Sequence, residues 1–138
     1  MIDRNTWIGL TAAALCVVFA LAAPSGGGEI DTLKKSTLAI HDEAMKTMAD
    51  MNRIGRMLKR EMTTLDTLAP RRAVIRQALG RMKQAEEGMY AWMQQYTPPD
   101  DMKPEVAKPY LEDQKRKIEQ NRRDIQEALE AGRSLLKQ

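Results

Sequence analysis

The chain of 138 residues has little cysteine, histidine or aromatic character: one Cys, one His, and 4% aromatic residues. A single cysteine excludes an internal disulfide framework. One histidine, together with a cysteine inside an apolar run, supplies too few ligands for an ordinary zinc site. No glycine-rich phosphate loop, nucleophile elbow or metalloprotease motif occurs, and the acidic pair Glu86-Glu87 has no second carboxylate or histidine at di-iron spacing. We therefore predict that the protein is not an enzyme.

Strand patterns are also missing. No segment shows the alternation of β-branched and aromatic residues with polar ones that is typical of strands. After residue 29 the chain consists mainly of Ala, Leu, Met, Gln, Glu, Lys and Arg, all good helix formers. The composition predicts an all-α fold, and the length leaves room for one domain, over residues 30–138.

The N-terminal part contains an uncharged, mostly apolar run from Trp7 to Ala23. Its length lies between that of a signal-peptide core and that of a membrane span. Residues 20–22 (ALA) offer a cleavage site, so residues 1–23 are interpreted as a signal peptide or an uncleaved signal anchor. Both interpretations place the rest of the chain in the periplasm or cell envelope. Leu15 before Cys16 and an apolar stretch after it do not fit a lipidation site, which favours a buried thiol. Residues 24–29, with one proline and three glycines, are predicted to be a flexible linker.

Apolar residues then recur three or four positions apart in three segments, which predicts an antiparallel helical hairpin plus a third helix, a three-helix bundle. The first helix is expected from Asp31, as N-cap, to Leu65, and the second from Pro70 to the residues before Pro98. The third is expected to begin near Pro104 or Pro109 and to reach the C-terminus. The predicted core faces are Leu38, His41, Met45, Met48, Met51, Gly55, Leu58, Met62 and Leu65; Ile75, Ala78, Met82, Ala85, Met89, Trp92 and Tyr96; and Leu111, Gln114, Ile118, Asn121, Ile125, Ala128, Gly132 and Leu135.

Basic residues gather around the hairpin. Residues 53–83 contain nine lysines and arginines but only two acidic residues, Glu61 and Asp66, although the net charge of the whole chain is only +3. This distribution is typical of a solvated hairpin end. It also fits a surface, around Arg71, Arg72 and Arg76, that contacts a partner. Nucleic acid is not expected as that partner, because interleaved aromatic residues and a known binding motif are absent.

Folding the hairpin near residue 69 brings residues whose numbers sum to about 138–140 to the same level. Met45 and Met48 of the first helix then lie beside Met89, Trp92 and Met93 of the second, with His41 near Tyr96. Imidazole and thioether groups are the ligands that the soft cation Cu(I) prefers, and an indole face attracts cations. Bacterial periplasmic copper chaperones resemble this set in ligand types, on a different fold. We therefore take His41, Met45, Met48, Met89 and Met93 as candidate Cu(I) ligands and Trp92 as a covering side chain.

Three alternatives stay open at this point. Methionines at helical spacing also serve as flexible core fillers, in which case the cluster is packing and no metal binds. The chain would then be a structural or adaptor module of an envelope protein complex, tied to the membrane by its N-terminal segment. Gln114 and Asn121 make the face of the third helix partly polar, so a protein partner or a homodimer that completes the bundle is also reasonable.

Two segments resemble a family of small exported proteins from Bacteroidota-type bacteria. Residues 39–48 (AIHDEAMKTM) are similar to an HDE-x-M-x-x-M stretch of these proteins, and residues 85–93 (AEEGMYAWM) to an acidic pair followed by M-x-x-W-M. Members are typically lipoproteins with no established activity, and some carry the label "viral A-type inclusion protein". The resemblance implies export and a helical fold, and it supplies no catalytic residues. The first segment includes His41, Met45 and Met48, and the second includes Met89, Trp92 and Met93.

Overall fold

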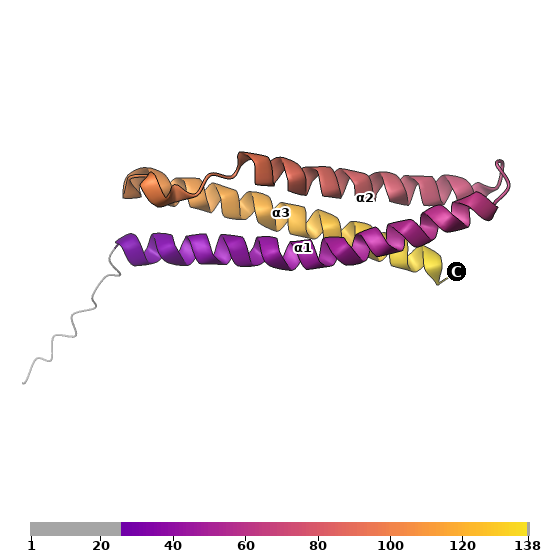
Figure 1. Ribbon diagram of the computed structural model, residues 1–138, viewed down its shortest axis with the longest axis horizontal. Helices are drawn as coiled ribbons and strands as arrows, with labels where there is room; N and C mark the ends of the chain where they lie inside the picture. The colour runs from indigo at the N-terminus through magenta and orange to yellow at the C-terminus, as the bar shows by residue number, and fades with distance from the viewer. Residues whose placement is uncertain (1–25, 138) are drawn as a thin grey trace, which may run out of the picture.

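The computed structural model describes residues 26–137, so the segment over residues 1–23 that is predicted to direct export lies outside the described range. The described chain consists of helices α1 (Gly26–Thr64), α2 (Pro70–Gln95) and α3 (Pro104–Leu136), with a short 3₁₀ helix, η1 (Pro99–Asp101), before α3. The three long helices run up, down and up, so that α1 and α3 are parallel and α2 is antiparallel to both (Figure 1). The prediction of an all-α hairpin plus a third helix is confirmed.

Helix α1 begins at Gly26, five residues before the expected start at Asp31. The structure therefore differs from the predicted linker over residues 24–29, because residues 26–29 form the first turn of the helix. The amide groups of a first turn have no acceptor within the helix, so a negative charge beside them is favourable. Glu29 supplies that charge and forms an ion pair with Lys108 of α3 at 2.7 Å, which fastens the first turn to the bundle.

The ends of α2 follow its prolines. The turn before it is closed by Asp66, whose side chain accepts a hydrogen bond from the Leu68 amide at 2.8 Å and whose carbonyl accepts one from Ala69 at 3.1 Å. Pro70 then occupies the first helical position, where its missing N–H costs nothing. At the other end Pro98 cannot continue a helix, and α2 ends as expected.

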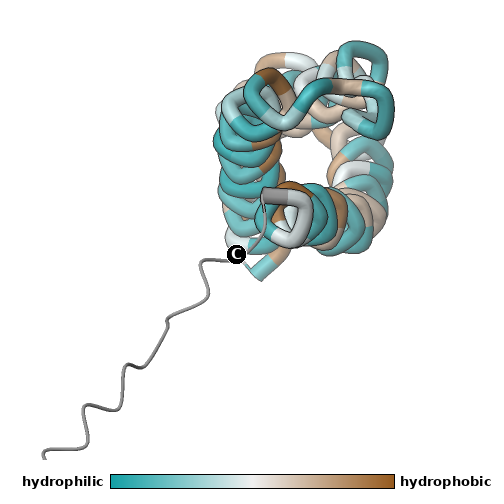
Figure 2. Tube along the Cα trace, turned by 90° about the vertical axis from the view of Figure 1, so that its left-hand side faces the viewer, coloured by the Kyte–Doolittle hydropathy of each residue, from teal (hydrophilic) through white to brown (hydrophobic). Residues whose placement is uncertain are grey.

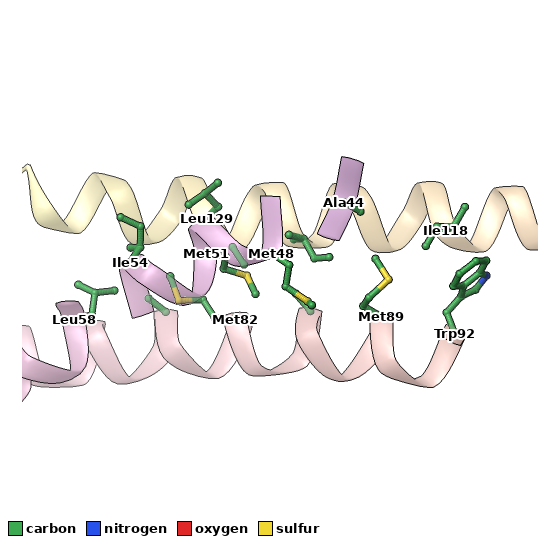
Figure 3. Packing of buried hydrophobic residues seen from close by; sticks show 14 of the residues in the cluster. Ala44, Met48, Met51, Ile54, Leu58, Met82, Met89, Trp92, Ile118 and Leu129 are labelled. Carbon is green, nitrogen blue, oxygen red and sulfur yellow. The ribbon is translucent and has the colours of Figure 1, made fainter. Parts of the chain in front are cut away.

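The core is one continuous cluster of buried side chains from all three long helices (Figure 3). On α2 the buried residues are six of the seven predicted ones, and the seventh, Tyr96, is partly buried. On α3, which begins at Pro104, Ala107 and Leu129 join the predicted face. The fully or almost fully buried apolar residues of the three helices are Ala44, Met48, Met51, Ile54, Leu58; Ile75, Ala78, Met82, Ala85, Met89, Trp92; and Ala107, Leu111, Ile118, Ile125, Ala128, Leu129.

The buried face of α1 differs from the predicted one in its first half. Leu38 is 36% exposed, whereas Thr37 and Ala44 are completely buried. The reason is that α1 packs more extensively on α3 than on α2. A helix that faces two neighbours buries a wider sector than a single stripe, and here this sector is turned towards α3. His41 and Met45 therefore lie at the edge of the core rather than at its centre.

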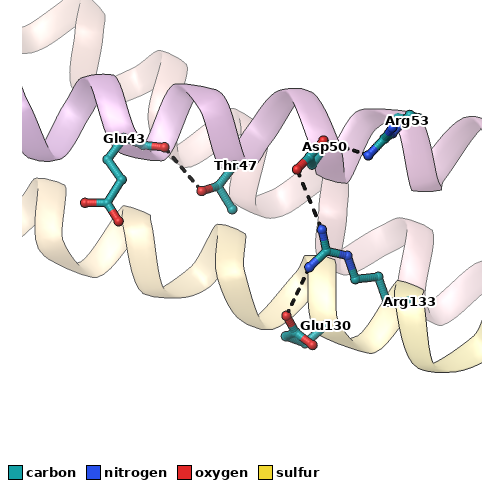
Figure 4. Close-up of polar contacts among 6 residues, drawn as sticks. All are labelled: Glu43, Thr47, Asp50, Arg53, Glu130 and Arg133. Carbon is teal, nitrogen blue, oxygen red and sulfur yellow. Dashed lines mark hydrogen bonds and ion pairs between the residues drawn. The ribbon is translucent and has the colours of Figure 1, made fainter.

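Polar contacts align the helices along their length. Arg133 of α3 lies 3.6 Å from the Asp50 carboxylate of α1 and 3.4 Å from Glu130, while Asp50 also contacts Arg53 (Figure 4). Such exposed pairs stabilise a protein by less than about 1 kcal/mol each. Together with the pair at the start of α1, they match residues of α1 with residues about eighty positions later in α3.

Most of the outer surface is hydrophilic. A view along the bundle shows the helices around a common centre, with hydrophilic residues over most of their outward sides (Figure 2). In residues 26–137 no helix is both long enough and apolar enough to cross a membrane.

Candidate ligand-binding site

A row of four aromatic rings crosses the bundle near the end of α2. The rings of His41 in α1 and Trp92 in α2 stack with centroids 5.5 Å apart and an angle of 28° between their planes. Tyr96 stacks on Trp92 at 4.9 Å, and Tyr110 of α3 lies 6.3 Å from Tyr96. The row therefore contains side chains from all three long helices.

The chain places these rings by simple local rules. Trp92 and Tyr96 are four residues apart, so they lie one above the other on one face of α2. The helix ends at Gln95 with Tyr96 as its C-cap, and the next amide, that of Thr97, donates a hydrogen bond to the Tyr110 hydroxyl at 2.7 Å. This bond joins the end of α2 to α3. Burial raises the pKa of the Tyr96 phenol, and Tyr110 raises it further, whereas the Lys34 ammonium lowers it.

His41 has one ring nitrogen in use and one free. Its Nδ1 lies 3.0 Å from the Asp42 carboxylate, and a carboxylate only accepts, so Nδ1 carries the hydrogen. The lone pair of the neutral imidazole is then on Nε2. That atom is buried and has no hydrogen-bond partner among residues 26–137. A histidine that binds a metal usually donates its second N–H to a carboxylate in this manner.

Three of the four candidate methionines lie in the core or against it. The Asn52 side chain of α1 donates a hydrogen bond to the Glu86 carboxylate of α2 at 3.1 Å. Residues of the two helices whose numbers sum to 138 therefore lie at the same level, within the expected range. Met48 and Met89 are 4% and 0% exposed in the core, and Met45 packs against the same cluster from its edge. In Figure 3 Met89 and Trp92 point from α2 towards Ile118 of α3.

Met93 is different, because it is 42% exposed. It follows Met89 by four residues but Trp92 by only one, and neighbours in a helix point about 100° apart. The expectation that Met93 converges with the buried methionines is therefore wrong. Its level on α2 is still that of Met45 on α1, since the two residue numbers sum to 138.

Four further buried polar atoms lack a hydrogen-bond partner within the described residues: Trp92 Nε1, the Tyr96 hydroxyl, Gln114 Oε1 and, at the hairpin end, Arg72 Nε. Trp92 and Gln114 are 6% and 5% exposed, and unpaired polar groups at such depth are unusual. Sequence reasoning placed Gln114 on the core face but gave it no role. A polar residue in an apolar stripe was the available signal. Tyr110 was missed, because no pattern predicts its contact with Tyr96.

The chemistry of this section is that of a soft donor set. In residues 26–137 no three His, Cys, Asp or Glu side chains are arranged to hold a metal ion. A metal bound here would depend on thioether sulfur together with His41 Nε2, a combination that favours Cu(I) over harder cations. The indole of Trp92, stacked on the imidazole, would face such a cation.

Two of the three arginines predicted to form the contact surface at the hairpin end, Arg71 and Arg72, have a mainly structural role. Arg71 contacts Glu61 and donates to the Leu135 carbonyl at 2.7 Å. Arg72 donates to the carbonyls at the end of α1, Met62 at 2.6 Å and Leu65 at 3.4 Å. These contacts satisfy carbonyl groups that a helix end leaves unpaired. Arg71 and Arg72 therefore hold the turn together, which leaves Arg76 as the exposed member of the predicted contact surface.

Comparison of the chain with protein-family models, with curated proteins and with solved structures found no match. The resemblance to small exported proteins of Bacteroidota-type bacteria stays a prediction.

Proposed function

We propose that the chain is an exported or membrane-anchored helical protein of the cell envelope that binds Cu(I). The ligands are His41 through Nε2 and the thioethers of Met45, Met48 and Met89, with Trp92 beside the ion. Met93 is left out of this set because of its exposure. The apolar run over residues 7–23 supports the location, and the absence of any catalytic motif supports a binding role rather than an enzymatic one.

The observation that carries the proposal is the buried, unpartnered Nε2 of His41. A buried lone pair without a partner is unfavourable, typically by about 1–3 kcal/mol. A cation at this atom would remove that penalty. The Asp42 carboxylate already fixes the required tautomer, so the imidazole would bind without reorganising.

The test is an anaerobic titration of the purified protein with Cu(I) against a competing chelator, read by chelator absorbance and tryptophan fluorescence. Replacing His41 with phenylalanine keeps an aromatic ring against Trp92 but removes Nε2. Replacing Met48 and Met89 with leucine keeps the core volume, at a cost below about 1.5 kcal/mol for each exchange. We expect one ion per chain, and an affinity at least about ten-fold lower in both variants.

Met57→Leu is the matched control, since Met57 lies on α1 and is 47% exposed. It should bind Cu(I) as the unchanged protein does. A Trp7→Phe background assigns the fluorescence change to Trp92. Unchanged affinity in His41→Phe, with helicity intact, would contradict the proposed site and favour the interpretation of the methionines as core packing.

A further inference from the structure

A groove of about 530 Å³ lies between α1 and α2, on the tip side of the aromatic row. Its floor is formed by Gly55, Leu79, Gly80 and Met82. A Cβ atom added at Gly80 would meet nothing within 4 Å, and one at Gly55 would meet only the side chains of Met82 and Leu79. The floor is therefore apolar. At the exposed Gly80 it is open to the close approach of another backbone, whereas Gly55 is buried beside the Met82 and Leu79 side chains.

The rim of the groove is basic. Arg56 and Lys59 of α1 face Arg76 and Lys83 of α2 across it, and all four side chains are exposed. In the part of the chain that the structure describes, Lys83 contacts Glu87 at 3.6 Å, whereas the other three make no ion pair. The rim acid, Glu86, is hydrogen-bonded to Asn52. The groove thus carries unpaired positive charge on both walls.

Beyond this groove the same flanks of α1 and α2 become apolar. Counting back two heptads from Asn52 gives Met45 and Leu38, and counting on one heptad from Lys83 and Glu86 gives Tyr90 and Met93. Residues seven apart lie on nearly the same face of a helix. Leu38, Tyr90 and Met93 are 36%, 46% and 42% exposed. Together they form an apolar strip that continues the groove towards the aromatic row.

From these two parts we infer that the α1–α2 flank docks an amphipathic helix of a partner protein, with acidic residues along one half and apolar residues along the other. From Leu38 to Lys59 the surface is roughly 30 Å long at 1.5 Å per residue, the length of a helix of about 20 residues. A helix laid there would be the fourth of a four-helix bundle. This inference goes beyond Cu(I) binding and does not depend on His41.

Charge decides between a partner and a second copy of this chain. In a twofold dimer the same surface is used on both subunits. Two α1–α2 flanks placed face to face in parallel would bring like charges together from both rims, and in antiparallel orientation each basic rim would lie over the other copy's apolar strip. Both arrangements are unfavourable. An acidic helix instead places its carboxylates against Arg56, Lys59 and Arg76, while its apolar half covers Tyr90 and Met93.

The test uses a synthetic, fluorescently labelled peptide of about 20 residues, with a leucine stripe throughout and glutamates flanking the stripe in one half. Its binding to the full chain is measured by fluorescence anisotropy. The reversal Arg56→Glu/Arg76→Glu should weaken binding at least about ten-fold, because it replaces attraction by repulsion. Gly80→Trp fills the floor and should also weaken binding, and the open space at Gly80 means that the bundle should still fold.

The matched control is Lys46→Glu/Arg81→Glu, which makes the same change of charge on the same two helices outside the groove. It should change the affinity less than about two-fold once salt screening is considered. A peptide with lysines in place of the glutamates should not bind.

Three results would overturn the inference. The first is equal loss of binding in the groove variant and in the control. The second is a chain that dimerises without peptide and becomes monomeric on Gly80→Trp, which would identify a second copy as the occupant. The third is no peptide binding together with retention on vesicles of anionic lipid that the groove reversal abolishes, which would identify a lipid surface.

Discussion

Replacing Gly132 with alanine should destabilise the bundle, whereas the same replacement at Gly80 should stabilise it. Both glycines lie inside helices, where alanine is favoured by about 1 kcal/mol. They differ in what surrounds them. At Gly80 the new methyl group meets nothing within 4 Å, so the full helix preference is gained. Gly80→Ala should raise the free energy of unfolding by about 0.5–1 kcal/mol.

At Gly132 the new methyl group has no room. Its position is 2.2 Å from Met82 Cε and 2.9 Å from Ile54 Cγ2. The end of the Met82 side chain is flexible and can move, but the Ile54 methyl group is on a β-branched side chain with few rotamers. Overpacking of this kind costs about 1–3 kcal/mol. Subtracting the helix preference leaves a net loss of up to about 2 kcal/mol, so the two variants should differ by about 1–3 kcal/mol.

Urea unfolding followed by circular dichroism measures this difference directly. A double-mutant cycle with Ile54→Ala checks its cause, because removing the Ile54 Cγ2 methyl group creates the missing space and should reduce the penalty at Gly132. Equal stabilisation by Gly80→Ala and Gly132→Ala would refute the close approach of α3 to Met82 that the structure shows.

Two further predictions concern hydrogen bonds. Arg72→Ala should lower the free energy of unfolding by about 1–3 kcal/mol, because two carbonyls at the end of α1 lose a charged donor; urea unfolding of this variant checks it. Tyr96→Phe should be nearly neutral or stabilising, since the Tyr96 hydroxyl has no partner in residues 26–137, whereas Tyr110→Phe removes the acceptor of the Thr97 amide and should destabilise. Because the pKa of Tyr96 is raised by folding, its contribution is complete below the ordinary phenol pKa of about 10 and is lost as the pH rises through the raised value. An absorbance titration of tyrosine ionisation, with Tyr96→Phe as reference, checks the sign.

The sequence alone predicted α2 well and α1 less well, for a physical reason. The face of α2 from Ile75 to Trp92 alternates steps of three and four without interruption, so its core side has one interpretation. On α1 both Thr37 and Leu38 are positioned near the inner face. Hydrophobicity favours Leu38, and only the packing on α3 selects Thr37, whose hydroxyl is satisfied by the Leu33 carbonyl at 2.8 Å.

The buried positions of Met48, Met89 and Trp92 were predicted from the sequence, but the details of the candidate site were not. Antiparallel register placed His41 near Tyr96, whereas in the structure its ring stacks on Trp92. The exposure of Met93 depends on how α2 is rotated about its own axis. Matching the levels of residues on α1 and α2 does not predict that rotation. The structural roles of Arg71 and Arg72 also escaped prediction, because they depend on the conformation of the turn and not on charge pattern.

The aromatic row makes one end of the bundle optically distinct from the other. Trp92 is the one tryptophan within residues 26–137, and it lies near the end of α2 that is far from the 65–69 turn, stacked on His41 of α1. In a Trp7→Phe chain, its emission would report melting of that end alone, while circular dichroism averages over all helices. Comparing the two signals during heating therefore shows whether the molecule melts as a single cooperative unit or frays first at the hairpin tip.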